Sequence, residues 1–271
     1  MNYQIFEPNI GLADFVKSYW TLESPEEHTP KRNTIVPDGT MKMIFHYGDA
    51  YRHYPESGQS FLLPKCFLIG QLTRPYNVAP TGITGTFFVR FHPEGFLPFA
   101  TFPIKNMENT AIPLEQLFGK EGRAIGYKVL SAGNTLERIN LIESFLLKRL
   151  IATKTADEIV QSTVETIWTT NGQIPIQELS RQNNIHRRQL VRKFSSTIGL
   201  SPKQLSKTVR LQATLKTLLN KKIISLTDLA YENQYYDQAH FIKEFKAFTG
   251  LTPKEFYGDD LRMSLIFDRL A

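Results

Sequence analysis

Basic and amide side chains recur at helical spacing in residues 176–205, which read IQELSRQNNIHRRQLVRKFSSTIGLSPKQL. Leu190 and Phe194 are one helical turn apart, so they share a face of a predicted helix and are expected to be buried. The residues left for the exposed face are His186, Arg187, Arg188, Gln189, Arg192 and Lys193. Arginine can donate two hydrogen bonds to guanine O6 and N7, and glutamine can pair with adenine N6 and N7. This face therefore predicts contacts with the bases and phosphates of DNA.

A second segment of the same design follows at residues 226–256, LTDLAYENQYYDQAHFIKEFKAFTGLTPKEF. Phe241 and Phe245 form the equivalent buried pair. The residues expected on its exposed face are Gln238, Ala239, His240, Lys243 and Lys246. This face is less basic and also carries Asp237 and Glu244, so it is expected to bind DNA more weakly or to tolerate more sequences.

The two segments end in nearly identical heptads, GLSPKQL from Gly199 and GLTPKEF from Gly250. Glycine ends a helix easily in the left-handed conformation, the Ser or Thr can cap the next helix, and proline suits its first position. Each segment thus predicts a short helix, a polar break and a second helix. Such a helix-turn-helix unit inserts its second helix into the DNA major groove.

Apolar residues at helical spacing over residues 201–220 predict one helix between the two units, and this helix also carries Lys203, expected to contact phosphate. A helix of about 19 residues is roughly 28 Å long. Successive major-groove segments on one side of DNA are about 34 Å apart, so a rod of this length could hold both second helices near adjacent segments.

The charge distribution agrees with this prediction. The 271-residue chain has a net charge of +6, yet residues 171–257 alone hold 14 Lys and Arg against 6 Asp and Glu, a net +8. Residues 186–222 contain ten basic residues and no acidic one. A basic surface kept for solubility is the plainer explanation, and a surface that meets phosphates is the more specific one.

The N-terminal part has short extended patterns at residues 19–22, 41–47, 65–69 and 84–91, separated by Gly- and Pro-containing turns. Many short strands at this spacing favour a barrel or a sandwich. Residues 12–18 predict a short helix. Between residues 136 and 150 a broad apolar stripe predicts a helix that packs on the barrel or pairs with a second copy of the chain.

Catalytic and metal-binding patterns are weak. His46, His53 and His92 are candidate metal ligands, but there is no H-x-H pair, and His92 and Glu94 flank a proline and are expected to shape a turn. Cys66 is the one cysteine, which excludes an intrachain disulfide and a four-thiolate zinc site. No nucleophile elbow, P-loop or dinucleotide motif occurs. We therefore expect no catalytic residue, metal or cofactor, and the absence of a signal peptide or long apolar run predicts a cytoplasmic protein with no membrane partner.

The C-terminal half resembles the DNA-binding domain of AraC/XylS transcription regulators. The resemblance covers roughly residues 156–257 and rests on LVRKF at 190–194, FIKEF at 241–245 followed by TGLTP at 249–253, and RLQA at 210–213. It implies base contacts by Arg188, Val191, Arg192, Gln238, Ala239, His240 and Lys243. Val191 and Ala239 offer only apolar contacts, for instance to a thymine methyl. One departure is Gln234-Tyr235, where the family usually has Gly-Phe, and a glutamine is costlier than glycine in a left-handed turn.

The N-terminal half resembles, through IVPDG at 35–39 and VRFHPEG at 89–95, the cupin-like β-barrel domain that some members carry. Such domains sense small molecules or support dimerisation. Candidate ligand-binding residues are Trp20, Phe45, Tyr47 and Arg90, although strand alternation predicts that Arg90 points outward.

The predicted protein is α+β, with a β-rich sensor or dimerisation domain at residues 1–108, a helical linker at 109–155 and an all-α double helix-turn-helix domain at 156–271. Its predicted function is sequence-specific transcription regulation in response to a small molecule. Double-stranded DNA, an effector, RNA polymerase and a second copy of the chain are its candidate partners. Two alternatives stay open: an N-terminal domain that only dimerises, and an enzyme in the N-terminal barrel.

Overall fold

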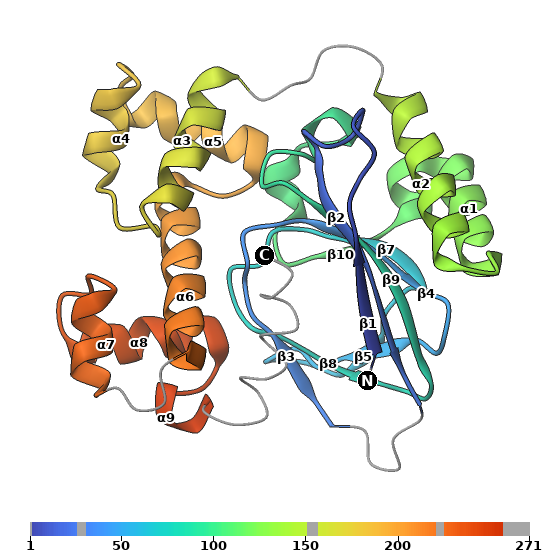
Figure 1. Cartoon of the computed structure of the whole chain (residues 1–271), viewed down its shortest axis with the longest axis horizontal. Helices are drawn as coiled ribbons and strands as arrows, with labels where there is room; N and C mark the ends of the chain where they lie inside the picture. The colour runs from blue at the N-terminus through green and yellow to red at the C-terminus, as the bar shows by residue number, and fades with distance from the viewer. Residues whose placement is uncertain (1, 26–30, 151–156, 221–224, 257–271) are drawn as a thin grey trace.

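The computed structural model describes residues 2–25, 31–150, 157–220 and 225–256. A β-rich part and an all-helical part lie side by side, with helices α1 and α2 on the far side of the sheets from the helical part (Figure 1). The expected domain boundary at residues 155–156 and the basic residues Lys221 and Lys222 fall outside the described residues. Within the described part, no helix is long and apolar enough to cross a membrane.

The N-terminal part consists of two antiparallel sheets, ordered β1-β2-β9-β4-β7-β10 and β3-β8-β5-β6. The larger sheet is built from β1 (Asn2–Phe6), β2 (Val16–Ser24), β4 (Lys42–His46), β7 (Cys66–Ile69), β9 (Thr84–Phe91) and β10 (Ala111–Pro113). The smaller sheet is built from β3 (Asn33–Ile35), β5 (Tyr51–His53), β6 (Phe61–Leu62) and β8 (Tyr76–Pro80). Among the described residues, no strand of one sheet pairs with a strand of the other, so the two sheets do not form a closed barrel. The α+β fold class is the one that the sequence predicts.

The central strands of the larger sheet are buried on both faces. Along β4, Met43 and Phe45 point into a core shared with α1 and α2, whereas Ile44 points between the two sheets. All eight residues of β9 are buried for the same reason. The strands predicted at residues 19–22, 41–47, 65–69 and 84–91 are confirmed as β2, β4, β7 and β9.

Two expectations for this part are wrong. Residues 12–15 form turns and β2 begins at Val16, so there is no helix at 12–18. Arg90 is 1% exposed and points inward, because the second sheet covers the face of β9 that alternation assigned to solvent.

Helices α1 (Leu114–Ser131) and α2 (Thr135–Arg149) pack against the outer face of the larger sheet. The apolar stripe of α2 is used there, because Ile139, Ile142 and Leu146 lie in the same cluster as Phe45 and Val89 of the sheet. Of the two possibilities for this stripe, the structure therefore shows packing within the chain.

The helical part contains α3 (Glu158–Thr169), α4 (Ile176–Gln182), α5 (Arg187–Ile198), α6 (Pro202–Asn220), α7 (Leu226–Glu232), α8 (Gln238–Thr249) and α9 (Pro253–Phe256). Short 3-10 helices η1 (Leu97–Phe99) and η2 (Ile104–Met107) belong to the β-rich part. Leu205 and Val209 of α6 belong to the core of the first unit, α3 to α5. Leu211 and Leu215 of α6 belong to the core of the second unit, α7 to α9. One 19-residue helix thus supports both units, as predicted.

The repeated heptads do what their residue types predict. Gly199 and Gly250 follow α5 and α8 with φ of 86° and 79°, in the left-handed region. Ser201 then caps α6, since its hydroxyl accepts from Gln204 N at 3.2 Å while Gln204 Oε1 accepts from Ser201 N at 2.8 Å. Thr252 and Glu255 form the same reciprocal capping box at α9.

The turns of the two units share one backbone feature. Asn184 and Gln234 both have positive φ, 46° and 52°. The second turn, between Glu232 and Gln238, is one residue longer than the first, between Gln182 and Arg187. Gln234 therefore keeps the left-handed turn that glycine usually provides, at a conformational cost.

Replacing Gln234 with glycine should raise the free energy of unfolding by about 0.5–1 kcal/mol, because glycine adopts positive φ without the steric cost of a Cβ. Urea denaturation would measure the change. Asn184→Gly is the matched control and should gain less, since asparagine tolerates this conformation better than glutamine. Equal gains in the free energy of unfolding for the two variants, or a lower value for Gln234→Gly, would contradict strain at the second turn.

Candidate functional site

Helix α5 presents the polar face that the sequence predicts. Arg188, Gln189 and Arg192 are exposed and Val191 is half-buried. Leu190 and Phe194 on the opposite face are fully buried in the core of the first unit. No side chain caps the N-terminus of α5, so its first-turn N–H groups can donate to a phosphate.

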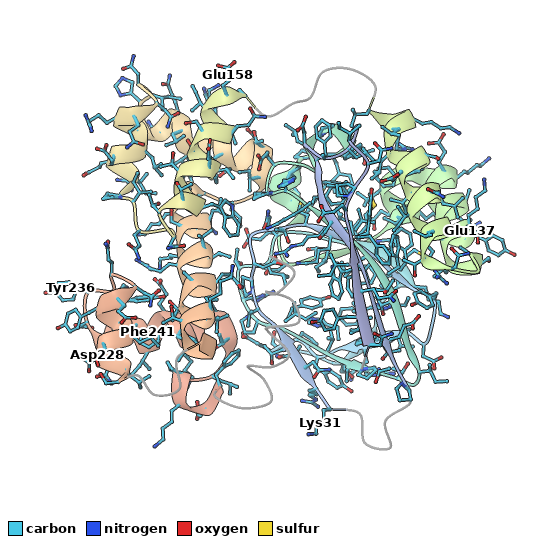
Figure 2. All side chains as sticks on the ribbon, in the orientation of Figure 1. Lys31, Glu137, Glu158, Asp228, Tyr236 and Phe241 are labelled. Carbon is cyan, nitrogen blue, oxygen red and sulfur yellow. The ribbon has the colours of Figure 1, made fainter. Side chains whose placement is uncertain are left out.

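Helix α8 is arranged in the same way. Gln238, Ala239, His240 and Lys243 are exposed, and Phe241 and Phe245 are buried. Its N-terminus differs from that of α5, because the Asp237 carboxylate accepts a hydrogen bond from His240 N at 2.7 Å. Tyr236, in the turn before α8, reaches outward at the outer edge of the second unit (Figure 2).

Glu244 does not belong to the exposed face of α8, where the sequence interpretation had counted it. Its side chain is 4% exposed and pairs with Lys207 at 2.7 Å and Arg210 at 2.6 Å, both on α6. Burial acts to raise the pKa of Glu244, but the hydrogen bonds and charges of these two cations lower it. The removal of this carboxylate from the surface leaves the exposed face of α8 more cationic than its sequence suggests.

The residues predicted to contact phosphate are mostly free to do so. His186, Arg187, Lys203 and Lys246 are exposed. Lys193 is half-buried and pairs with Asp157, the N-cap residue of α3. A phosphate contact by Lys193 would therefore have to replace this ion pair.

The two units lie at opposite ends of α6, and the first helix of each helix-turn-helix pair, α4 and α7, lies on the side of α6 away from the sheets (Figure 1). The β-rich part thus leaves the N-terminal ends of α5 and α8 uncovered. This arrangement can present two cationic helices to one duplex.

A cavity of about 50 Å³ lies between the two sheets. Its lining is mostly apolar, with Thr40, Lys42 and His46 among its few polar side chains. The apolar walls are Leu22, Ile35, Ile44, Leu63, Phe67, Ile69, Leu72, Val78 and Phe88, completed by Asn33, Tyr51 and Tyr76. Ligand pockets are usually several times larger, so a ligand would have to widen this cavity.

The four residues predicted to bind a ligand do not line this cavity. Phe45 points to the opposite face of the sheet, and the Tyr47 hydroxyl donates to Glu23 at 2.7 Å. Trp20 stacks on Phe88 with ring centroids 3.5 Å apart, beside the cavity. Arg90 lies beyond its end, against Asp38.

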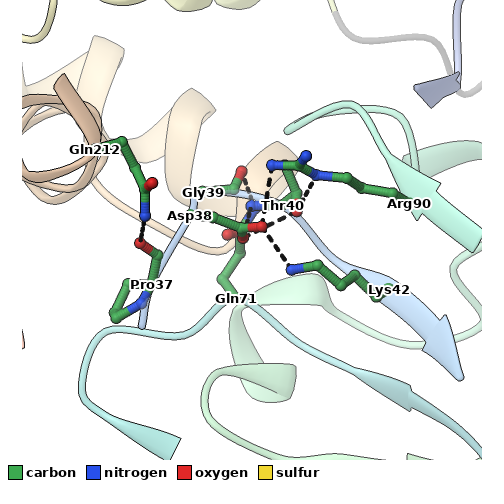
Figure 3. Close-up of polar contacts among 8 residues, drawn as sticks. All are labelled: Pro37, Asp38, Gly39, Thr40, Lys42, Gln71, Arg90 and Gln212. Atoms are coloured by element: carbon green, nitrogen blue, oxygen red, sulfur yellow. Dashed lines mark hydrogen bonds and ion pairs between the residues drawn. The ribbon is translucent and has the colours of Figure 1, made fainter. Parts of the chain in front are cut away.

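Three buried charges meet at this end of the cavity (Figure 3). Asp38 Oδ2 is 2.7 Å from Lys42 Nζ and 3.1 Å from an Arg90 guanidinium nitrogen. Its other oxygen accepts from the backbone N–H and the hydroxyl of Thr40. Burial acts to raise the pKa of Asp38, but the two cations and these hydrogen bonds lower it to about 2. Asp38 is therefore ionised at neutral pH.

The histidines take structural positions. His46 shares a hydrogen bond with Thr86 and stacks on Tyr51, and burial, helped by the charge of Lys65, lowers its pKa to about 3. His53 stacks on Tyr76, and His92 contacts Ala13 O at 3.1 Å. Among the described residues, no three His, Cys, Asp or Glu side chains are grouped to hold a metal.

The sequence interpretation missed Asp38, Lys42, Gln71 and Gln212, which organise the contact between the two parts of the molecule (Figure 3). The sequence could have predicted a buried ion pair at Lys42, because this lysine lies in the apolar run MKMIF, where a charge needs a buried partner. No comparable signal marks Gln212, a polar residue on a helix.

Two family models match the chain. One described as a domain of unknown function (DUF6597) matches residues 4–113, and one described as a helix-turn-helix domain matches residues 179–258. The second match confirms the predicted helix-turn-helix region. No curated protein matches the chain significantly.

Several solved structures resemble the chain at low identity. ToxT from Vibrio cholerae O395 is 13% identical over 91% of this chain and 98% of that one, with a TM-score of 0.49. Unsaturated fatty acid-bound ToxT from Vibrio cholerae strain SCE256 is 12% identical over 96% and 95%, with a TM-score of 0.46. The C-terminal domain of AraT, a response regulator from Geobacillus stearothermophilus, is 19% identical over 38% and 86%, with a TM-score of 0.35. At these values the likenesses support no inference about ligand or partner.

Replacing Glu244 with glutamine should lower the free energy of unfolding by about 2–3 kcal/mol at pH 7, because it leaves the Lys207 and Arg210 charges without their carboxylate. The folded-state pKa of Glu244 lies below its ordinary 4.5, so its stabilisation is present above that pH and is lost as the pH falls through the lowered value. The difference between wild type and variant should therefore shrink in acid.

Urea denaturation at pH 7 and over a series of pH values below 4.5 would measure both effects. Glu178→Gln is the control, since Glu178 pairs with Arg181 on the surface and its loss should leave stability unchanged. A Glu244→Gln variant as stable as wild type at pH 7 would contradict the role of this ion pair.

Proposed function

We infer that this protein, whose C-terminal half is an AraC-type helix-turn-helix domain, regulates transcription by inserting α5 and α8 into two adjacent major-groove segments of one DNA site. One observation supports this most strongly: two units of the same design are held at the two ends of α6, and each exposes the polar face of its second helix. In this scheme the DNA-binding domain spans residues 156–271, the sensor domain spans residues 1–108 and the linker spans residues 109–155.

The exposed side chains suggest a division of roles. We assign base contacts to Arg188, Gln189, Val191 and Arg192 on α5 and to Gln238, Ala239, His240 and Lys243 on α8. Phosphate contacts fall to His186, Arg187, Lys193, Lys203 and Lys246. Among the residues assigned to base contact, α5 has two exposed arginines, Arg188 and Arg192, that can bind guanine bidentately, and α8 has none. The first unit therefore contributes most of the sequence preference.

The cavity between the sheets is the proposed effector site. Its walls are apolar and Lys42 supplies an ammonium group at one end, so the effector class that fits is a small apolar molecule with one anionic group. Such a molecule would meet a regulator in the cytoplasm, where its DNA target lies.

Two further partners belong to the proposal. Tyr127, Leu136 and Leu147 are exposed on α1 and α2, on the side away from the helical part, and supply an apolar surface for a second copy of the chain. RNA polymerase is the partner of a regulator that activates.

Base readout by Arg188 can be separated from phosphate contact by Lys203. On a DNA site selected by the protein from random sequences, Arg188→Ala should lose about 1–3 kcal/mol and relax preference at one base position. Lys203→Ala should weaken binding to all sequences alike, and it should reduce the slope of log affinity against log salt concentration by about one. Fluorescence anisotropy with single-base variants of the site measures both, and equal losses for Arg188→Ala on every variant would refute base readout.

The effector site can be tested with hexanoate as a probe and hexanol as its neutral counterpart. Hexanoate should raise the thermal midpoint of the full chain more than hexanol does. At ten times its Kd, hexanoate should add about 1.4 kcal/mol to the free energy of unfolding. Ile44→Phe should remove the effect, because the larger side chain fills the cavity that Ile44 lines. A midpoint unmoved by hexanoate, or moved equally in Ile44→Phe, would refute this site.

A further inference from the structure

Residues 36–40, here called the docking segment, connect β3 of the smaller sheet to β4 of the larger one. All five residues are buried, although they form neither helix nor strand. The segment closes one end of the space between the sheets and lies against α6 (Figure 3).

On its α6 side the docking segment contacts both helix-turn-helix units. The amide of Gln212 on α6 donates to Pro37 O at 2.6 Å. Gly39 lies so close to Leu205 that an added Cβ would be 2.8 Å from its Cδ1. Val36 belongs to the hydrophobic core of the second unit, with Leu211. Since Leu205 belongs to the core of the first unit, the segment bridges the two cores where they meet on α6.

Other contacts between the two parts of the molecule each involve a single unit. Gly199 after α5 lies against Ile104 of η2, and the ammonium of Lys17 lies 5.4 Å from the centre of the Trp168 ring in the first unit. In the second unit, Gly250 lies near Pro75. Among these described contacts between the two parts, only those of the docking segment reach both units, which α6 also connects.

On its other side the docking segment is bound to residues that line the effector cavity. Thr40 and Lys42 line the cavity, and Lys42 is bound to Asp38, in the middle of the segment, at 2.7 Å. The amide of Gln71 fixes the next residue by donating to Gly39 O at 3.1 Å. An anionic group that enters the cavity therefore competes with Asp38 for the Lys42 ammonium.

We propose that the docking segment transmits occupancy of the cavity to the DNA-binding domain. An anionic effector draws Lys42 away from Asp38 and loosens residues 36–40 from α6. α6 still connects the two helix-turn-helix units, but without this brace it bends more freely and their relative orientation varies. This rests on the effector site and the two-unit DNA contact proposed above. When the units are held in one orientation, the second binds as an intramolecular event at high effective concentration, and that advantage falls once their relative orientation varies. The effector accordingly weakens binding to DNA that carries both half-sites and leaves binding to a single half-site unchanged.

A glycine pair in the chain gives a matched test that needs no effector. Gly39 and Gly58 both have positive φ, 73° and 99°, so alanine introduces similar backbone strain at each. Only at Gly39 does the new methyl meet α6, whereas nothing lies within 4 Å at Gly58. Gly39→Ala thus disturbs docking, and Gly58→Ala controls for strain.

The experiment measures the affinity of the full-length variants for a DNA site selected by wild type and for the same site with one half scrambled. Gly39→Ala should lower affinity for the intact site about tenfold or more. Its affinity for the half-scrambled site should stay within about twofold of the wild-type value. Gly58→Ala should change neither. Gln212→Ala, which removes the hydrogen bond to Pro37 without strain, should behave like Gly39→Ala, and amide hydrogen exchange in α6 should quicken in both docking variants.

Hexanoate supplies the effector arm. On wild type it should weaken binding to the intact site selectively and quicken exchange in α6, and hexanol should do neither. The proposed brace between the units would be overturned if the docking variants bound the intact site as tightly as wild type. It would also be overturned if they lost equal affinity for the intact and the half-scrambled sites. If the docking variants lose affinity for the intact site alone but wild type does not respond to hexanoate, the effector step is overturned. The proposed role of the docking segment in bracing the two units would then stand.

Discussion

The structure depends on one helix that belongs to two cores. The N-terminal half of α6 completes the first unit through Leu205 and Val209, and the following turns complete the second through Leu211 and Leu215. At roughly 1.5 Å per residue, its 19 residues fix the separation of the units at the scale of the DNA groove repeat. Because neither unit can bury its apolar residues without α6, the distance between two DNA-reading surfaces is set by the same packing that folds the domain.

The features that the sequence predicted are local ones. Left-handed glycine, the Ser or Thr cap and the following proline act within a few residues, so the heptads at Gly199 and Gly250 revealed both helix starts and stops. Long apolar strands such as β9 were equally evident. Strands of two to five residues at the sheet edges, such as β6 and β10, carry too few residues for a pattern, and they form because neighbouring strands pair with them.

Contacts between distant segments could not be predicted. Gln212 and Pro37 are 175 residues apart, and nothing in either neighbourhood indicates the other. Arg90 was placed outward by alternation, since one exposed face is the usual state of an antiparallel sheet. Here α1 and α2 cover one face and the second sheet covers the other, so Asp38, Lys42 and Arg90 share a buried site. Burying three charges is costly unless they pair, so the loss of Lys42 as a partner destabilises the position of Asp38 in the docking segment.

The central claim, that α5 and α8 read two groove segments at a distance fixed by α6, is tested most directly by changing the spacing of the half-sites. Affinity would be measured for a selected DNA site and for versions with about five and about ten base pairs inserted between its halves, a half and a full helical turn. The account predicts that both insertions reduce affinity to that of a single half-site, because a rod of fixed length cannot span either gap. Undiminished affinity for either inserted site would contradict it.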